Sequence, residues 1–168
     1  MSSDTPRWLD DEQQQAWRQY LHASRLLEAV MDRDLQAHGL QLSEYEIIAV
    51  LSEQPGRKLR MSALAEMVVQ SRSRLTHTAG RLADRGWVRR EPCLGDRRGV
   101  ELVLTDAGTT AVRQMAPTHV RSVLDNLVDP LPREDFLALG RAMAVVGRAI
   151  ETAGLCEEGA LAAEEQPA

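Results

Sequence analysis

The sequence predicts a mainly α-helical protein with one small β-hairpin, and three observations support this fold class. Apolar residues recur every three or four positions along most of the chain, which is the period of an amphipathic helix. Between positions 87 and 104 this period gives way to the alternation of strands, on both sides of a loop rich in proline and glycine. Two short helices joined by a turn come directly before this hairpin. That order is typical of a winged helix-turn-helix.

A long helix is predicted near the start of the chain. Residues 1–10 are expected to be flexible, whereas 11–38 contain no proline or glycine and carry an apolar stripe. Gly39 follows as a helix-ending signal. Ser43 is then expected to cap a second helix that ends near Glu53.

The helix-turn-helix and the wing are predicted in the middle of the chain. Ser62 is expected to cap a short third helix, and Ser71 opens a fourth helix, Arg72 to Arg85, which would be the recognition helix. Two short strands follow, Trp87 to Glu91 and Val100 to Leu104, and together they form the wing.

Two further helices are predicted after the wing. Thr105 is expected to cap a fifth helix, and Pro132 suits the first turn of a sixth helix that reaches Ile150. Residues 156–168 are rich in alanine and glutamate without a stable pattern, which predicts a disordered tail.

The helices at the two ends are surplus to reading DNA. A DNA-binding lobe needs only residues 43–105, but the apolar stripes of 11–38 and 106–153 must also be buried. The sequence therefore predicts one domain, residues 11–155, in which a winged helix-turn-helix core is flanked by N- and C-terminal dimerisation helices.

The composition also bounds the class of protein. A chain of 168 residues, 43% hydrophobic and 27% charged, is typical of one soluble globular domain. We find no secretory signal and no apolar run long enough to span a membrane, which predicts a cytoplasmic protein. The net charge is −5, yet Arg57 to Arg98 contain eleven basic and four acidic residues. This segment of +7 in an acidic chain predicts one surface that meets a polyanion such as DNA.

Catalytic and metal chemistry have little support in the sequence. Cys93 and Cys156 match no metal-binding spacing, and the four histidines form no ligand pair. No catalytic serine motif, P-loop or dinucleotide motif occurs. The sequence therefore predicts no enzyme, no cofactor and no metal, and Cys93 is expected to be an inert thiol.

Several segments together resemble the MarR family of bacterial regulators. Residues 42–51 (LSEYEIIAVL) are similar to the family's second helix, and residues 71–76 (SRSRLT) to its recognition helix. Residues 96–98 (DRR) are similar to its Asp-x-Arg wing, and 104–108 (LTDAG) to the Leu-Thr-x-x-Gly start of its next helix. The resemblance implies an obligate homodimer that binds double-stranded DNA at a pseudo-palindromic operator. It also implies that a small ligand relieves repression.

The predicted DNA contacts lie before the third helix, on the recognition helix and in the wing. At the start of the recognition helix, hydroxyls and backbone N–H groups can bind phosphate, and arginine can bind guanine. The resemblance implies that Arg98 enters the minor groove and that Arg97 lies near phosphate, while Asp96 can hold the loop closed. Arg81 is expected to touch phosphate or an acid of its own chain. The predicted set is Arg60, Ser71, Arg72, Ser73, Arg74, Thr76, His77, Arg81, Asp96, Arg97 and Arg98.

A ligand cleft is implied between the first helix and the DNA-binding lobe, because members of this family commonly bind aromatic acids there. Arg18 or Arg25 would pair with the carboxylate of a small aromatic or phenolic ligand. The predicted lining is Trp17, Arg18, Tyr20, Ser24, Arg25 and Tyr45. In the alternative interpretation, these aromatic residues belong to the core.

The main alternative function is a winged-helix module that binds another protein and no DNA. Such a module would neutralise its basic residues with acids of its own chain, whereas the charge of +7 favours DNA.

Overall fold

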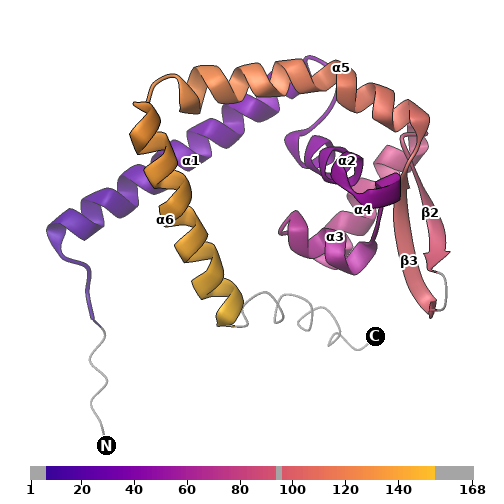
Figure 1. Cartoon of the computed structure of the whole chain (residues 1–168), viewed down its shortest axis with the longest axis horizontal. Coiled ribbons are helices and arrows are strands. Elements are labelled where there is room, and N and C mark those ends of the chain that lie inside the picture. Colours follow the sequence, from indigo (N-terminus) through magenta and orange to yellow (C-terminus); the bar gives the residue numbers. More distant parts are fainter. Residues whose placement is uncertain (1–6, 94–95, 154–168) are drawn as a thin grey trace, which may run out of the picture.

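The computed structural model describes residues 7–93 and 96–153, and its element order confirms the mainly helical winged helix-turn-helix (Figure 1). The elements are α1 (Asp11–Gln36), α2 (Leu42–Glu53), η1 (Pro55–Arg57), β1 (Lys58–Arg60), α3 (Met61–Met67), α4 (Arg72–Asp84), β2 (Val88–Cys93), β3 (Asp96–Leu104), α5 (Asp106–Val123), η2 (Leu124–Val128) and α6 (Arg133–Thr152). No described helix is long and apolar enough to cross a membrane.

Two long helices span the molecule. Helices α1 and α5 pack against each other, as Figure 1 shows along the upper edge. The lobe made of α2, α3, α4 and the sheet lies below one end of this pair, and α6 descends from the other end. The lobe and α6 are therefore joined mainly through the long helices.

The sheet has three antiparallel strands in the order β1-β3-β2. Strand β1 pairs Lys58 with Val103 and Arg60 with Glu101, and it was not predicted. Both hairpin strands are also longer than expected, with a register shift between Pro92 and Cys93. The three residues of β1, two of which are basic, show no strand pattern in the sequence. They form a strand because they pair with β3.

Two helix starts differ from the predicted ones. Helix α2 begins at Leu42, and the Glu44 carboxylate accepts the backbone N–H of Gln41, so that Gln41 and not Ser43 is the N-cap. Helix α3 begins at Met61 and has no side-chain cap, so Ser62 does not have the predicted role. In both cases the chain enters the helix earlier in the sequence than the serine suggested.

The caps of α4 and α5 are confirmed. The Ser71 hydroxyl accepts the backbone N–H of Arg74 at 3.3 Å, and the Thr105 hydroxyl accepts that of Gly108 at 3.0 Å. At Gly108 a Cβ atom would overlap the carbonyl oxygen of Trp87. Glycine is thus required where α5 starts against the wing.

The core of the lobe is built from leucine and isoleucine side chains of several elements. Its fully buried apolar members are Leu35, Leu40, Ile47, Ile48, Leu51, Leu64, Leu75, Leu82, Leu102 and Leu104. Burying each such side chain contributes about 1.5–3 kcal/mol. This core fixes α4 against α2 and the sheet, and so determines which face of α4 is presented to solvent.

The turn between α3 and α4 contains a residue in an unfavourable conformation. Val69 has φ 49°, in the left-handed region that a β-branched residue rarely adopts. Its N–H is donated to the carbonyl of Glu66, and that of Gln70 to Ala65, which is the pattern of a glycine-type helix end. Val69 is 85% exposed, so packing does not explain its presence.

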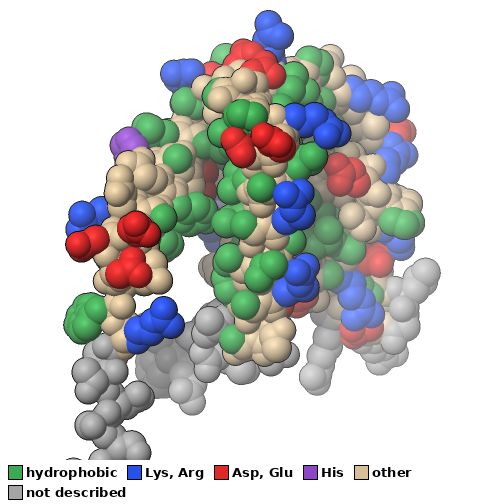
Figure 2. Space-filling view, turned by 60° about the vertical axis from the view of Figure 1, so that its left-hand side comes forward, with side chains coloured by type: hydrophobic (Ala, Val, Ile, Leu, Met, Phe, Trp, Pro, Cys, Tyr) green, Lys and Arg blue, Asp and Glu red, His purple; other side chains and the backbone are tan. Residues whose placement is uncertain are grey.

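Helix α6 has no buried residue in the single chain. Its apolar side chains form a stripe that Figure 2 shows in green, with basic groups along one side of it. The exposed members are Leu137, Leu139, Met143, Val145, Val146 and Ile150. Trp17, Tyr20 and Leu26 of α1 are exposed as well. One chain alone thus leaves large apolar faces of its end helices uncovered.

Candidate nucleic-acid interface

The start of α4 presents a polar, basic turn to solvent. Leu75, Thr78, Ala79 and Leu82 are buried and anchor one face of the helix. The opposite face is therefore exposed, and it carries Ser71, Arg72, Ser73, Arg74, Thr76 and His77. The helix N-terminus adds a partial positive charge and unpaired N–H groups at the same place.

The side chains of Arg72 and Arg74 make no hydrogen bond or salt bridge with any other described residue. Next to them, the starts of α2 and α4 border a shallow hollow of about 360 Å³. Gln41, the N-cap of α2, and Ser43 line it together with Ser71, Ser73 and Arg74. Gln41 and Ser43 were absent from the predicted set, because only the packing of α2 against α4 brings them to this surface.

Arg81 is held by its own chain. Its Nε donates to Oε1 of Glu44 at 2.8 Å, and its Nη2 donates to Oε1 of Gln41 at 3.1 Å. The side chain of Glu44 is only 3% exposed, so this is a nearly buried carboxylate joined to a partly exposed cation. Of the two roles expected for Arg81, the structure shows the contact with an acid of the same chain.

An ion pair joins β1 to the wing near the turn of the hairpin. Arg60 of β1 donates to Oδ2 of Asp96 at 3.1 Å, at the start of β3. Arg60 and Asp96, which were both predicted to contact DNA, thus form an ion pair with each other. Arg97 and Arg98 belong to β3, and their side chains lie outside the described residues.

The basic segment is less free than its composition suggested. Among the described side chains, five of its eleven cations form salt bridges with carboxylates: Arg57, Lys58, Arg60, Arg81 and Arg89. Arg85 and Arg90 donate to backbone carbonyls instead. The charge of +7 therefore does not by itself decide between DNA and a protein partner. Arg72 and Arg74 at the start of α4, which form no salt bridge with a described residue, are the stronger argument for DNA.

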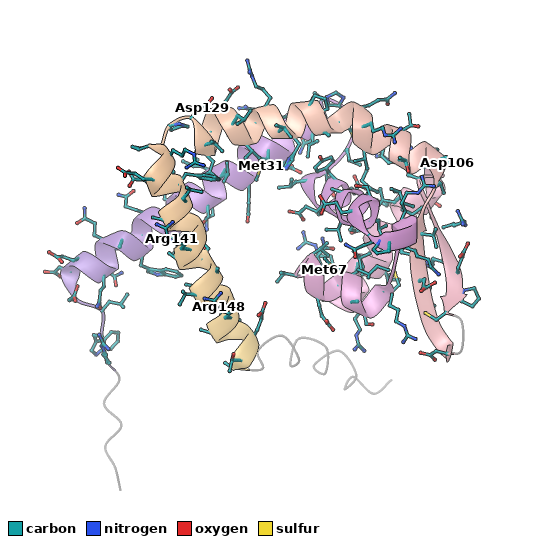
Figure 3. All side chains as sticks on the ribbon, viewed as in Figure 1. Met31, Met67, Asp106, Asp129, Arg141 and Arg148 are labelled. Atoms are coloured by element: carbon teal, nitrogen blue, oxygen red, sulfur yellow. The ribbon has the colours of Figure 1, made fainter. Side chains whose placement is uncertain are left out.

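A larger groove separates α1 from the lobe. Its volume is about 1150 Å³, and Met31 of α1 and Met67 of α3, labelled in Figure 3, both line it. Tyr45 and Arg25 of the predicted ligand set lie in its wall. The ring of Tyr45 lies 4.7 Å from that of His119, centre to centre, and burial lowers the pKa of His119.

The other predicted ligand residues do not line this groove. Trp17 and Tyr20 stack on each other with ring centres 5.8 Å apart, further along α1. The Ser24 hydroxyl donates to the carbonyl of Tyr20, and Arg18 borders a separate shallow hollow on α1. Helical spacing placed these residues on one helix, but it could not show which of them face the lobe.

The described residues also bear on metal binding and thiol chemistry. Within residues 7–93 and 96–153, no cluster of three or more histidine, cysteine or acidic side chains is arranged to hold a metal ion. Cys93 is a free, buried thiol at the end of β2.

Comparisons with known proteins place this geometry in a family. Residues 38–99 match the model of the MarR family. The structure of Sco3205, a MarR family transcriptional regulator from Streptomyces coelicolor solved in complex with DNA, superposes with a TM-score of 0.84. It is 42% identical, over 88% of this chain and 93% of that chain. The regulator PecS of Dickeya dadantii is 29% identical over 74% of each chain. The transcriptional repressor MprA of Escherichia coli is 31% identical over 56% of this chain and 53% of its own.

Proposed function

The chain belongs to the MarR family of transcriptional regulators, and on this premise we propose that it is a sequence-specific repressor that binds a pseudo-palindromic operator as a homodimer. A small ligand relieves this repression. Regulation of transcription through DNA binding follows from the family. The repressor role, the dimer, the ligand response and the contact residues are the proposed part.

The exposed start of α4 carries the proposal. The side chains of Arg72 and Arg74 form no hydrogen bond or salt bridge with another described residue, and the hydroxyl of Ser73 lies between them in the sequence. In the major groove of DNA, Arg74 can bind a guanine edge, while Arg72 and the hydroxyls bind phosphate. The hollow beside Ser43 and Ser71 suits a backbone phosphate that lies between the starts of α2 and α4.

The wing supplies a second contact in this proposal. Arg98 enters the neighbouring minor groove and Arg97 lies near phosphate. The ion pair between Arg60 and Asp96 supports this geometry, because it ties the hairpin to β1 and limits its movement.

The uncovered faces of α6 and α1 support a homodimer. A second copy of the chain would bury the stripe that includes Val145, which is 60% exposed in the single chain. Removing residues 132–168 should therefore produce a monomer in sedimentation velocity experiments. A truncated protein that remains a stable dimer would place the interface elsewhere.

The ligand response is supported by the groove between α1 and the lobe. A ligand releases DNA only if it favours a conformation in which the two copies of α4 no longer match half-sites about one helical turn apart. The similarity to the repressor MprA favours repression over activation.

The direct test is binding to the DNA upstream of the protein's own gene, measured by fluorescence anisotropy at two salt concentrations. Specific binding that weakens steeply with salt is expected. The double variant Arg72→Ala, Arg74→Ala should lose this binding. Arg33→Ala, which removes an exposed cation of α1, should keep it. Absence of specific binding by the parent protein would favour the protein-interaction module.

A further inference from the structure

Arg81 contacts other described residues through all three nitrogens of its guanidinium group. Nε and Nη2 donate to Glu44 and Gln41 at the start of α2. The third nitrogen, Nη1, lies 3.3 Å from Nδ1 of His77, one turn earlier on α4. Because the guanidinium group is planar and rigid, the two contacts with the start of α2 also fix the direction of Nη1. The contact between α2 and α4 therefore extends to the exposed side chain of His77.

The contact with Arg81 determines which ring nitrogen of His77 carries a hydrogen. A guanidinium group donates hydrogen bonds and accepts none, so Nδ1 of His77 is the acceptor in this contact. A neutral imidazole whose Nδ1 accepts a hydrogen bond carries its hydrogen on Nε2. No described residue accepts a hydrogen bond from Nε2 of His77. The ring thus offers one donor, of defined position, to a partner outside the described chain.

The backbone at His77 is held by a second contact. Arg90 of β2 donates from Nη2 to the carbonyl oxygen of Thr76 at 2.8 Å. On the other side of His77 in the sequence, Thr78 is buried in the lobe. The neighbours of His77 and its ring are therefore both held in place, although the side chain itself is exposed. A directional contact made by such a side chain costs less conformational entropy when it forms.

His77 is also well spaced from Arg74 for reading adjacent bases. The two residues are three positions apart, so they lie on one face of α4, and both line the hollow between the starts of α2 and α4. Three residues of an α-helix advance about 4.5 Å along its axis, and neighbouring bases of one DNA strand are about 3.4 Å apart. A recognition helix in the major groove therefore brings the two side chains to neighbouring base pairs.

We propose that Arg81 is a positioning residue that holds His77 in the Nε2–H form, so that His77 donates a hydrogen bond to N7 of a purine in the major groove. This inference rests on the proposed DNA-binding function and names the class of base that one residue reads. Guanine and adenine present N7 as an acceptor in the major groove, whereas cytosine presents an amino donor and thymine an oxygen beside a methyl group. An Nε2–H donor therefore favours a purine and disfavours cytosine at this position.

The first test measures the ring of His77 in the absence of DNA. NMR of the imidazole nitrogens distinguishes the two neutral tautomers at about pH 8, where neutral imidazole predominates. The signal of His77 is the one that is missing from His77→Asn. We expect the Nε2–H form in the parent and in Arg81→Lys, which keeps a donor, and a larger share of the Nδ1–H form in Arg81→Met. A parent in the Nδ1–H form, or identical His77 signals in parent and Arg81→Met, would overturn the proposal.

A second variant keeps this test valid if Arg81→Met does not fold. The single substitution leaves the nearly buried carboxylate of Glu44 without its cation, which is strongly destabilising. The double variant Glu44→Gln, Arg81→Met removes both charges and still lacks the donor to His77. The same change in the tautomer of His77 is expected there, and its absence in the folded double variant would contradict the positioning role.

Substitutions of His77 locate the donor on the ring. The amide nitrogen of glutamine can occupy the place of Nε2, and that of asparagine the place of Nδ1. His77→Asn should therefore weaken operator binding by about tenfold, and His77→Gln by no more than about threefold. His22→Asn, which changes an exposed histidine of α1, is the matched control and should bind like the parent. Equal affinities of His77→Asn and His77→Gln would show that Nε2 is not the contacting atom.

Modified operators identify the acceptor. The bases 7-deazaguanine and 7-deazaadenine lack N7 but keep Watson–Crick pairing, and they replace the purines of a half-site one at a time. At one position the replacement should weaken binding of the parent by about tenfold, while it should not weaken binding of His77→Asn further. If no position shows this difference, His77 contacts phosphate or no DNA at all, and the assignment to a base is wrong.

The two kinds of measurement separate this inference from the proposed function. If the parent binds no operator, the proposed function fails, while the NMR spectra still decide the role of Arg81. If the parent binds its operator but no purine position depends on His77, the inference fails and the proposed function stands.

Discussion

Replacing Glu44 by glutamine removes one charge from the contact between α2 and α4 and leaves the side-chain shape nearly unchanged. One carboxylate oxygen of Glu44 accepts the Gln41 N–H at 2.9 Å, and the other accepts from Arg81 at 2.8 Å. Glutamine has only one acceptor oxygen, so it cannot keep both of these bonds. Because Arg81 lies on α4, the substitution also loosens the orientation of the proposed recognition helix.

The expected magnitude follows from burial. A hydrogen bond to a charged group contributes about 1.5–3 kcal/mol. Glu44 is nearly buried, but the Arg81 side chain is 39% exposed and water can replace part of its contact. We therefore expect Glu44→Gln to lower the free energy of unfolding by about 2 kcal/mol, near the lower part of that range.

For DNA affinity, two effects of Glu44→Gln have opposite signs. Removal of a negative charge about 10 Å from a phosphate strengthens binding by at most about 0.4 kcal/mol in water. A misplaced α4 costs about 1–3 kcal/mol for each bidentate hydrogen-bond pair to a base that can no longer form. The second effect is larger, so the variant should bind the operator several-fold more weakly.

Anisotropy titrations across a range of salt concentrations separate these effects, and urea unfolding measures stability. Glu44→Gln should weaken binding at every salt concentration with little change in the salt slope. Arg72→Gln, the matched control, should reduce the slope by about 0.9 for each phosphate that the protein no longer neutralises. A folded Glu44→Gln protein that binds the operator as tightly as the parent, or more tightly, would refute the positioning role.

Three further predictions concern other parts of the chain. Gly108→Ala should destabilise the protein by about 1–3 kcal/mol in urea unfolding, because the new methyl group meets the backbone of Trp87. Gly80→Ala, which has open space around it, should stabilise the protein by about 1 kcal/mol. Equal effects of the two substitutions would contradict this packing argument. Arg98→Ala should cost about 1–3 kcal/mol per half-site on operators with A·T-rich flanks, and Arg97→Ala less; equal affinities of parent and Arg98→Ala would exclude the wing contact. Burial lowers the pKa of His119, so the folded state binds fewer protons there and the parent loses stability as pH falls below 6.5. His119→Gln lacks this loss, and a difference in Tm between the two proteins that stays constant from pH 7.5 to pH 5 would contradict it.

The helical part of the fold could be predicted from local signals alone. Apolar spacing and helix-start residues together located the six α-helices of the described residues, and Ser71 and Thr105 marked two starts correctly because their side chains bond within their own turn. Strand β1 could not be found in this way. Its residues, Lys58 to Arg60, become a strand only through pairing with residues more than 40 positions away.

The candidate site was predictable in part for the same reason. The exposed start of α4 follows from its buried face, which the sequence period shows. The carboxylates that pair with Arg57, Lys58 and Arg81 could not be predicted in this way. They belong to Asp106, Glu101 and Glu44, which are outside the basic segment in the sequence and meet it only in the folded chain. The cleft between the first helix and the lobe was implied by the family resemblance, but only Arg25 and Tyr45 of its predicted lining lie in the groove, because the other lining side chains come from elements that meet only in the folded chain.

The conformation of Val69 affects how easily the turn between the groove and α4 can rearrange. A left-handed backbone costs a side chain with a Cβ about 1–2 kcal/mol compared with glycine. Any alternative arrangement in which Val69 leaves that region recovers this energy. Since about 1.4 kcal/mol corresponds to a factor of ten, such arrangements are about ten times more populated than they would be with glycine. One exposed valine thus shifts the resting ensemble of a turn that lies between Met67, at the groove, and the first residue of α4.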